Sequence, residues 1–116
     1  QAQTYRLAKR IPELRIPNKP KGIADLYDVS DDWIPIYDRS DLNGFYLAIG
    51  TSGNQYKNGP AIGRLMTELI HASENGHDHD AEPLQVRLRH VDIALHMGIF
   101  SRNREIIQGS TFSVLG

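Results

Sequence analysis

The residues best suited to chemistry lie in one short stretch, where a glycine turn precedes a lysine and a helix. Residues 45–49 (FYLAI) have the length and composition of a strand, and residues 50–54 (GTSGN) favour a turn. The first turn of a helix leaves backbone N–H groups without partners and carries a positive partial charge. With the cation of Lys57 nearby, this stretch is predicted to bind an anion or a polarised oxygen.

The helix after this turn is predicted from an apolar stripe. The stripe has the 3.6-residue period of a helix and comprises Ile62, Leu65, Met66, Leu69 and Ile70. Pro60 fits the first helical turn, and Asn75-Gly76 is a typical helix end. Taken alone, the pattern also fits an ordinary strand, turn and helix with a surface lysine.

Two acidic or histidine-containing sets invite a catalytic or metal-binding interpretation. Asp31 and Asp32 could act as an acid–base pair, but adjacent residues on a turn diverge, so no catalysis is expected there. His77, His79 and Asp80 could chelate a metal, yet the pattern supplies no further convergent ligand on an identifiable scaffold. We expect a solvated loop, with a His/Asp metal-binding module as the alternative.

Composition excludes several classes of partner. The 116 residues include 13 basic and 14 acidic side chains, a net charge of −1, which gives no electrostatic footprint for nucleic acid. The chain has no cysteine, hence no disulfide or thiolate metal site, which fits a reducing compartment. No apolar run reaches membrane-spanning length, and no signal-peptide pattern opens the chain. We therefore expect a cytoplasmic location.

The first third of the chain is predicted to hold a helix and a hairpin. Residues 3–14 read as a short basic helix that Pro12 stops. Residues 23–29 and 33–37 read as two strands, with the turn at residues 30–32.

The last third gives weaker signals. Residues 84–104 carry apolar residues that fit either strands or a helix, and both interpretations stay open. Residues 108–116 are expected to be irregular or a short strand.

The central stretch resembles the closing FAD-binding segment of the flavin-dependent amine and amino-acid oxidoreductases, the D-amino-acid oxidase and sarcosine/dimethylglycine dehydrogenase superfamily. The matching residues, in order, are Gly50, Thr51, Ser52, Gly53, Asn54, Gln55, Tyr56, Lys57 and, on the helix, Gly63. The chain departs from the family in having Asn54-Gln55 where many members have His-Gly. Residues 26–38 (LYDVSDDWIPIYD) are similar to the strand, turn and strand that precede this segment in the family.

The resemblance implies oxidation of a secondary or tertiary amine or amino acid, such as an N-methylglycine, by hydride transfer to FAD. It assigns cofactor contact to Gly50, Thr51, Ser52, Gly53, Asn54, Gln55, Tyr56 and Lys57. It gives Lys57 the substrate carboxylate or the flavin edge, and it puts Tyr27 on the substrate side. A cysteine that binds flavin covalently in some members is absent from residues 24–26, so FAD is expected to be noncovalent or attached outside this segment.

The resemblance covers only the last part of the family, and no G-x-G-x-x-G motif occurs here. Together with an opening residue other than methionine, this predicts a C-terminal fragment, inactive alone and completed by the rest of the chain or a companion subunit. The expected fold is α+β, part of a Rossmann-like flavoprotein. Residues 1–42 would belong to a substrate-side lobe, residues 43–72 would close the FAD site, and residues 73–116 would form an extension.

Exposed apolar edges would favour self-association of such a fragment. A non-catalytic structural or interaction domain is the alternative function.

Overall fold

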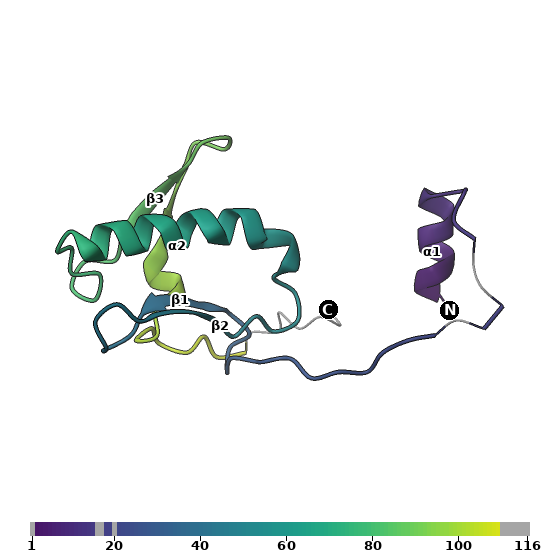
Figure 1. The fold of residues 1–116 in the computed structure, drawn as a ribbon, viewed down its shortest axis with the longest axis horizontal. Coiled ribbons are helices and arrows are strands. Elements are labelled where there is room, and N and C mark those ends of the chain that lie inside the picture. The colour runs from purple at the N-terminus through teal and green to yellow at the C-terminus, as the bar shows by residue number, and fades with distance from the viewer. Residues whose placement is uncertain (1, 16–17, 20, 110–116) are drawn as a thin grey trace.

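A computed structural model of the chain describes residues 2–15, 18–19 and 21–109 (Figure 1). In chain order the elements are α1 (Ala2–Arg10), β1 (Ile36–Arg39), β2 (Tyr46–Ile49), the 3-10 helix η1 (Tyr56–Asn58), α2 (Gly59–Glu74), β3 (Gln85–Leu88), β4 (Ile93–His96) and the 3-10 helix η2 (Met97–Phe100). They form a small α+β fold in which β1 pairs with β2 and β3 pairs with β4, both antiparallel. The α+β class is thereby confirmed.

The hydrophobic core lies where α2 packs over β1 (Figure 1). The buried hydrophobic residues within the described part of the chain are Tyr37, Leu65, Leu69, Val86 and Met97. The apolar stripe of α2 therefore faces the core as predicted, with Leu69 fully buried. Ile70, at the border of the stripe, is 38% exposed. The buried face of α2 is thus narrower than the apolar stripe predicted from the sequence.

The predicted bounds of the central helix are confirmed. Pro60 lies in the first turn of α2, and Asn75 is its C-terminal cap. Gly76 follows with φ of 88°, a left-handed conformation that suits glycine at a helix end. The difference lies at the start, where η1 stands between the glycine turn and α2.

The predicted hairpin of residues 23–29 and 33–37 is wrong. Strand β1 starts only at Ile36, and its partner is β2, with Ile36 opposite Ile49 and Arg39 opposite Tyr46. Residues 23–29 form no strand, and Leu26 is 96% exposed. The boundary expected after residue 42 thus falls in the loop that joins two paired strands.

A turn does form at residues 30–33, as the sequence predicts, and a further hydrogen bond joins it to Ile34. The N–H of Trp33 donates to the Ser30 carbonyl at 3.1 Å, and the Ser30 hydroxyl donates to the Ile34 carbonyl at 2.7 Å. Trp33 adopts a left-handed φ of 63°. Because the carbonyl of Ile34 is bound to Ser30, the backbone pairs with β2 only from Ile36 onward.

The ambiguous residues 84–104 form the hairpin of β3 and β4, followed by η2. Arg87 and Asp92 form an ion pair beside the connecting turn, where Asp92 has φ of 46°. The N–H of Met97 donates to the Leu84 carbonyl at 2.9 Å, which brings η2 back to the core. Residues 110–116 of the predicted tail lie outside the described residues.

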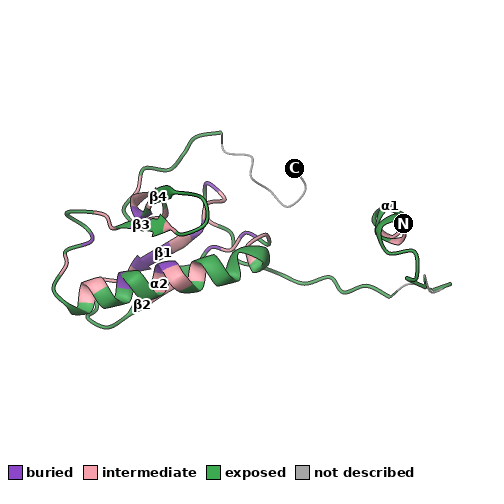
Figure 2. Ribbon diagram, turned by 90° about the horizontal axis from the view of Figure 1, so that it is seen from above, coloured by how far each residue is buried: buried purple, intermediate pink, exposed green. Residues whose placement is uncertain are grey.

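The chain exposes much more surface than a compact protein of its mass. Helix α1 lies apart from the other elements at the end of an extended segment, and exposed residues dominate both (Figures 1 and 2). The accessible surface is 9397 Å² for 13.1 kDa, against about 6,400 Å² for a typical monomer. The radius of gyration is 18.2 Å, against about 13 Å for a compact domain of this length. No helix within the described ranges is long and apolar enough to span a membrane.

Candidate functional site

The glycine turn links β2 to η1 and has an unusual backbone. Gly50, Ser52 and Gly53 have left-handed φ values of 67°, 50° and 71°. A Cβ on Gly50 would lie 3.3 Å from the Cβ of Ser30, so both the φ angle and the available space require glycine there. The buried hydroxyl of Ser52 donates to the Gly50 carbonyl at 3.2 Å, which closes the turn on itself.

Asp28 holds the start of this turn through both its side chain and its backbone. Its carboxylate accepts hydrogen bonds from the N–H of Gly50, the N–H of Thr51 at 3.1 Å and the Thr51 hydroxyl at 2.7 Å. Its carbonyl accepts the N–H of Ser52 at 2.9 Å. The Thr51 hydroxyl and these N–H groups lower the pKa of Asp28, so the carboxylate is charged at neutral pH.

The backbone donors left for a ligand lie after the turn. The N–H groups of Gly53 and of residues 55–57 meet no acceptor within the described part of the chain. Asn58 caps α2 without a side-chain hydrogen bond, so no polar side chain covers the positive end of that helix there. The side chain of Lys57 is exposed. Donors and positive charge therefore gather at residues 55–59.

A hollow of about 430 Å³ lies next to these donors. It is lined by Tyr37, Ala48, Thr51, Gly53, Gln55, Tyr56 and Ile62. The Tyr37 hydroxyl donates to Oε1 of Gln55 at 3.3 Å, which fixes the Gln55 side chain. Burial, and next to it the charge of Asp28, raises the pKa of Tyr37 to about 12, so this phenol stays protonated. An apolar hollow bordered by a few fixed polar groups is typical of small-molecule sites.

The structure brings the residues predicted for cofactor contact together in one turn, but it divides them into two groups. The N–H groups of residues 50–52 are bound by Asp28, whereas those of Gly53 and residues 55–57 meet no acceptor within the described residues. Contact with FAD stays a prediction for all eight residues. Tyr27 is half-exposed and directly precedes Asp28, the residue that binds the turn. Its place on the substrate side also stays a prediction.

Two residues of this region were missed by sequence reasoning. Asp28 falls within the predicted strand of residues 23–29, and Tyr37 ends the predicted strand of residues 33–37. No local pattern marks either one, because their partners Gly50 and Gln55 lie 22 and 18 residues away along the chain.

Asp32 is part of a buried ion pair, not of an acid–base dyad. Both of its oxygens accept hydrogen bonds from the Arg104 guanidinium, at 3.0 and 2.6 Å. The Arg104 hydrogen bond lowers the pKa of Asp32 to about 2. Asp31 beside it is exposed. A carboxyl that stays ionised at neutral pH and is held by arginine is a poor proton donor.

The expectation of a solvated loop at residues 77–80 is wrong for His79, whereas Asp80 is exposed but held in ion pairs. His79 is 1% exposed, and its Nδ1 accepts the N–H of Leu84 at 3.1 Å. Its Nε2 lies 3.8 Å from the buried Asp38 carboxylate. Asp80 pairs with Arg39 at 3.0 Å and with Arg102 at 2.8 Å. The loop therefore anchors the C-terminal segment to β1.

These contacts weigh against the metal-binding alternative. No group of three or more histidine, aspartate or glutamate side chains in the described ranges is arranged to hold a metal ion. The Nε2 atom of His77 is also engaged, with the Glu82 carbonyl at 2.9 Å.

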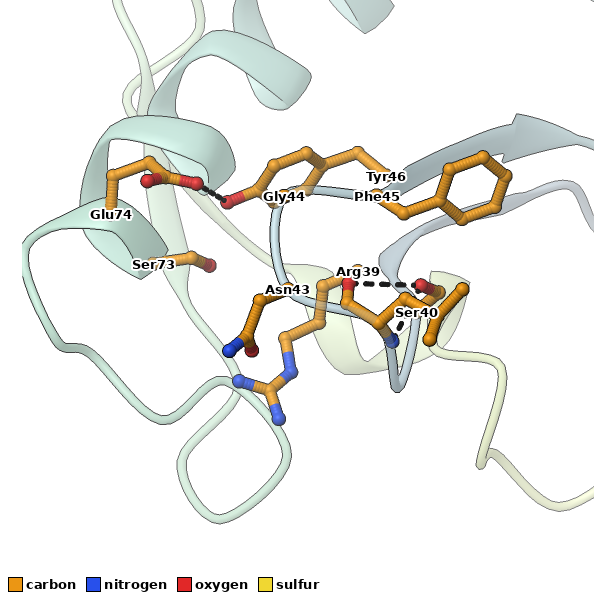
Figure 3. A pocket seen from close by; sticks show the side chains of 9 residues that line it. Arg39, Ser40, Asn43, Gly44, Phe45, Tyr46, Ser73 and Glu74 are labelled. Carbon is orange, nitrogen blue, oxygen red and sulfur yellow. Dashed lines mark hydrogen bonds between the residues drawn. The ribbon is translucent and has the colours of Figure 1, made fainter.

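A second hollow, of about 310 Å³, lies at the loop between β1 and β2 (Figure 3). Figure 3 shows the Tyr46 hydroxyl directed at Glu74, with which it forms a 2.7 Å hydrogen bond. The one guanidinium lining the hollow, that of Arg39, is already paired with Asp80. The Ser73 hydroxyl on its wall has no hydrogen-bond partner within the described part of the chain. Ser73 and Glu74 place this hollow at the C-terminal end of α2, away from Lys57 and the positive end of that helix, which makes the turn the better candidate site for an anion.

No family model, curated protein or solved structure matches the chain. What the site can do therefore follows from its own residues: a glycine turn, the open N–H groups that follow it, a helix N-terminus, an exposed lysine and an adjoining apolar hollow.

Proposed function

We propose that this chain is the C-terminal portion of an FAD-dependent oxidoreductase that oxidises a secondary or tertiary amine or amino acid, sarcosine-like, by hydride transfer. Its β2, glycine turn and α2 would close the FAD site of a Rossmann-like domain. The observation that carries the proposal is the set of donors at residues 55–59, which borders the apolar hollow beside the turn. The sequence resemblance of residues 43–71 to the closing segment of such enzymes supports it.

The residues present fit one edge of a flavin ring. Bound FAD would supply the ring that accepts the substrate hydride, and negative charge develops at its pyrimidine edge on reduction. The N–H groups of Gln55 and Lys57, with the positive end of α2, are suited to stabilise that charge. A helix N-terminus contributes up to about 2 kcal/mol, equivalent to about 40 mV in a two-electron couple. The exposed ammonium of Lys57 is suited to hold the substrate carboxylate.

The exposed surface supports the part of the proposal that concerns the rest of the protein. The surface excess over a compact monomer is about 3,000 Å², the difference between 9397 Å² and about 6,400 Å². Much of it is apolar, with Ile23 and Leu26 more than nine-tenths exposed. A surface of this size and kind is expected when further chain or a companion subunit covers it. A phosphate-binding glycine motif would have to come from that part as well.

The proposal is tested with the full-length protein from which this sequence derives. We expect the purified protein to show the absorption bands of oxidised flavin, which a sarcosine-like substrate bleaches. Absence of flavin in the protein, even after incubation with FAD, would favour a non-catalytic interaction domain, the alternative that the exposed apolar surface also suits.

Replacement of Lys57 tests the substrate contact. Lys57→Ala should raise KM for a carboxylated amine by about tenfold, since a charge-assisted hydrogen bond contributes about 1.5–3 kcal/mol. KM for a decarboxylated analogue should change little. Arg64→Ala serves as the control, because it removes a positive charge from α2, the helix that follows Lys57. Equal effects of Lys57→Ala on both substrates would exclude Lys57 from carboxylate binding.

A further inference from the structure

Asp28 connects two segments that the fold otherwise holds together only loosely. It lies in an extended stretch with no strand pairing, yet four hydrogen bonds join it to residues 50–52. Three of these bonds take up the N–H groups of consecutive turn residues, so the register between the two segments is fixed. A shift of either segment by one residue would break all of them.

This arrangement decides which N–H groups are left for a ligand. With the N–H groups of residues 50–52 bound to Asp28, the open donors on residues that line the hollow are those of Gly53, Gln55 and Tyr56, within the described part of the chain. Thr51 takes part in both sides of the arrangement, because it binds the Asp28 carboxylate and also lines the hollow.

We propose that Asp28 is the positioning residue of the cofactor turn: its carboxylate holds residues 50–52 in the one conformation that leaves the N–H groups of residues 53, 55 and 56, which line the hollow, open to the ligand. The inference rests on the proposed function, since the ligand is the flavin edge. Asp28 itself lines no part of the hollow and acts through the turn.

Substitutions at Asp28 and Thr51 can distinguish the loss of the hydrogen bonds from the loss of the Asp28 charge. In Asp28→Asn the amide oxygen can still accept the N–H groups of Gly50 and Thr51, and the amide N–H₂ can donate to the Thr51 hydroxyl. In Asp28→Ala all three side-chain bonds are lost. Thr51→Val removes only the hydroxyl bond. Asp25→Ala is the matched control, because Asp25 lies in the same extended stretch and its carboxylate accepts only the N–H of the next residue, Leu26.

The test uses the full-length protein and two measurements, the FAD dissociation constant of the apoprotein and hydrogen exchange of the amides of residues 50–52. Asp28→Ala should weaken FAD binding by about tenfold or more, since a hydrogen bond to a charged group contributes about a factor of ten or more. Thr51→Val should weaken it by only about threefold, because two of the three bonds to the Asp28 side chain remain to hold the turn. Asp28→Asn should restore affinity to within about threefold of the parent, and Asp25→Ala should match it. Exchange at residues 50–52 should accelerate in the same order.

The results separate the two proposals. If the parent protein binds FAD and Asp28→Ala and Thr51→Val bind it equally well, the positioning role is wrong and the flavin assignment stands. The same conclusion follows if Asp28→Asn fails to recover what Asp28→Ala loses. If the parent protein binds no FAD, both proposals fail, and accelerated exchange in Asp28→Ala would then show a bond that serves the fold alone.

Discussion

Asp32→Asn is the substitution whose effect follows most directly from the structure. The Asp32 side chain is fully buried and meets the Arg104 guanidinium with both oxygens, while Arg104 also donates to the Ile34 carbonyl at 2.8 Å. Asparagine preserves the size of the side chain but removes its charge. The substitution therefore leaves a guanidinium that is only 12% exposed without its counter-charge.

The size of the effect can be worked out from the pKa of Asp32. The Arg104 hydrogen bond lowers that pKa from 3.8 to about 2, which corresponds to about 2 kcal/mol of folded-state stability at neutral pH. Because the folded pKa is depressed, this contribution is complete above pH 3.8 and is lost as the pH falls toward 2. We expect Asp32→Asn to lower the free energy of unfolding by about 2–4 kcal/mol at pH 7.

The assay is urea unfolding of the chain between pH 7 and pH 2, followed by the fluorescence of its one tryptophan, Trp33, which adjoins the substituted residue. Asp31→Asn is the control, because this neighbouring carboxyl is exposed. The difference between parent and Asp32→Asn should shrink as the pH falls from 4 to 2. The reasoning is refuted if Asp32→Asn changes stability no more than Asp31→Asn at pH 7, or if the difference persists unchanged at pH 2.

Two further predictions concern stability and use the same urea titration. Leu69→Ala, at a fully buried position of α2, should lower the free energy of unfolding by about 2–5 kcal/mol, whereas Leu42→Ala, at a position 70% exposed, should change it by less than about 0.5 kcal/mol; equal effects would mean that α2 does not pack as described. Burial lowers the pKa of His79 from 6.5, against the opposing effect of Asp38. On acidification the unfolded chain therefore takes up the proton before the folded chain does. The free energy of unfolding should thus fall as the pH drops below 6.5. His79→Asn keeps an acceptor for the N–H of Leu84 and should flatten that dependence, whereas an unaltered slope would show that His79 is solvated.

The features predicted correctly are those that near neighbours in the sequence determine. The stripe of α2, Pro60 in its first turn and Gly76 after its end are each set within a few residues, and all are confirmed. The glycine turn likewise follows from Gly50 and Gly53, whose positive φ angles other residues rarely adopt.

The features predicted wrongly, or missed, depend on contacts between distant residues. Residues 23–29 alternate like a strand, but Asp28 binds the turn 22 residues away instead of a neighbouring strand. His79 is buried because it contacts Leu84 and Asp38. The polar residues next to it in the sequence give no indication of that burial. Periodicity reports which face of an element is apolar; it carries no information on which acidic side chain a distant arginine will meet.

Three carboxylates along one segment explain how the turn keeps its shape beside so much uncovered surface. Asp28 binds the glycine turn, Asp32 binds Arg104, and the buried Asp38 accepts the N–H of Arg102 at 2.8 Å and its guanidinium at 3.3 Å. Residues 28–38 are thereby tied on one side to the candidate site and on the other to the segment after η2. These three links are polar and involve no residue of 21–27, so they do not require the apolar surface of that stretch to be covered. It follows that the conformation of the turn is set by this chain alone; under the proposed function, further chain would supply only the rest of the site.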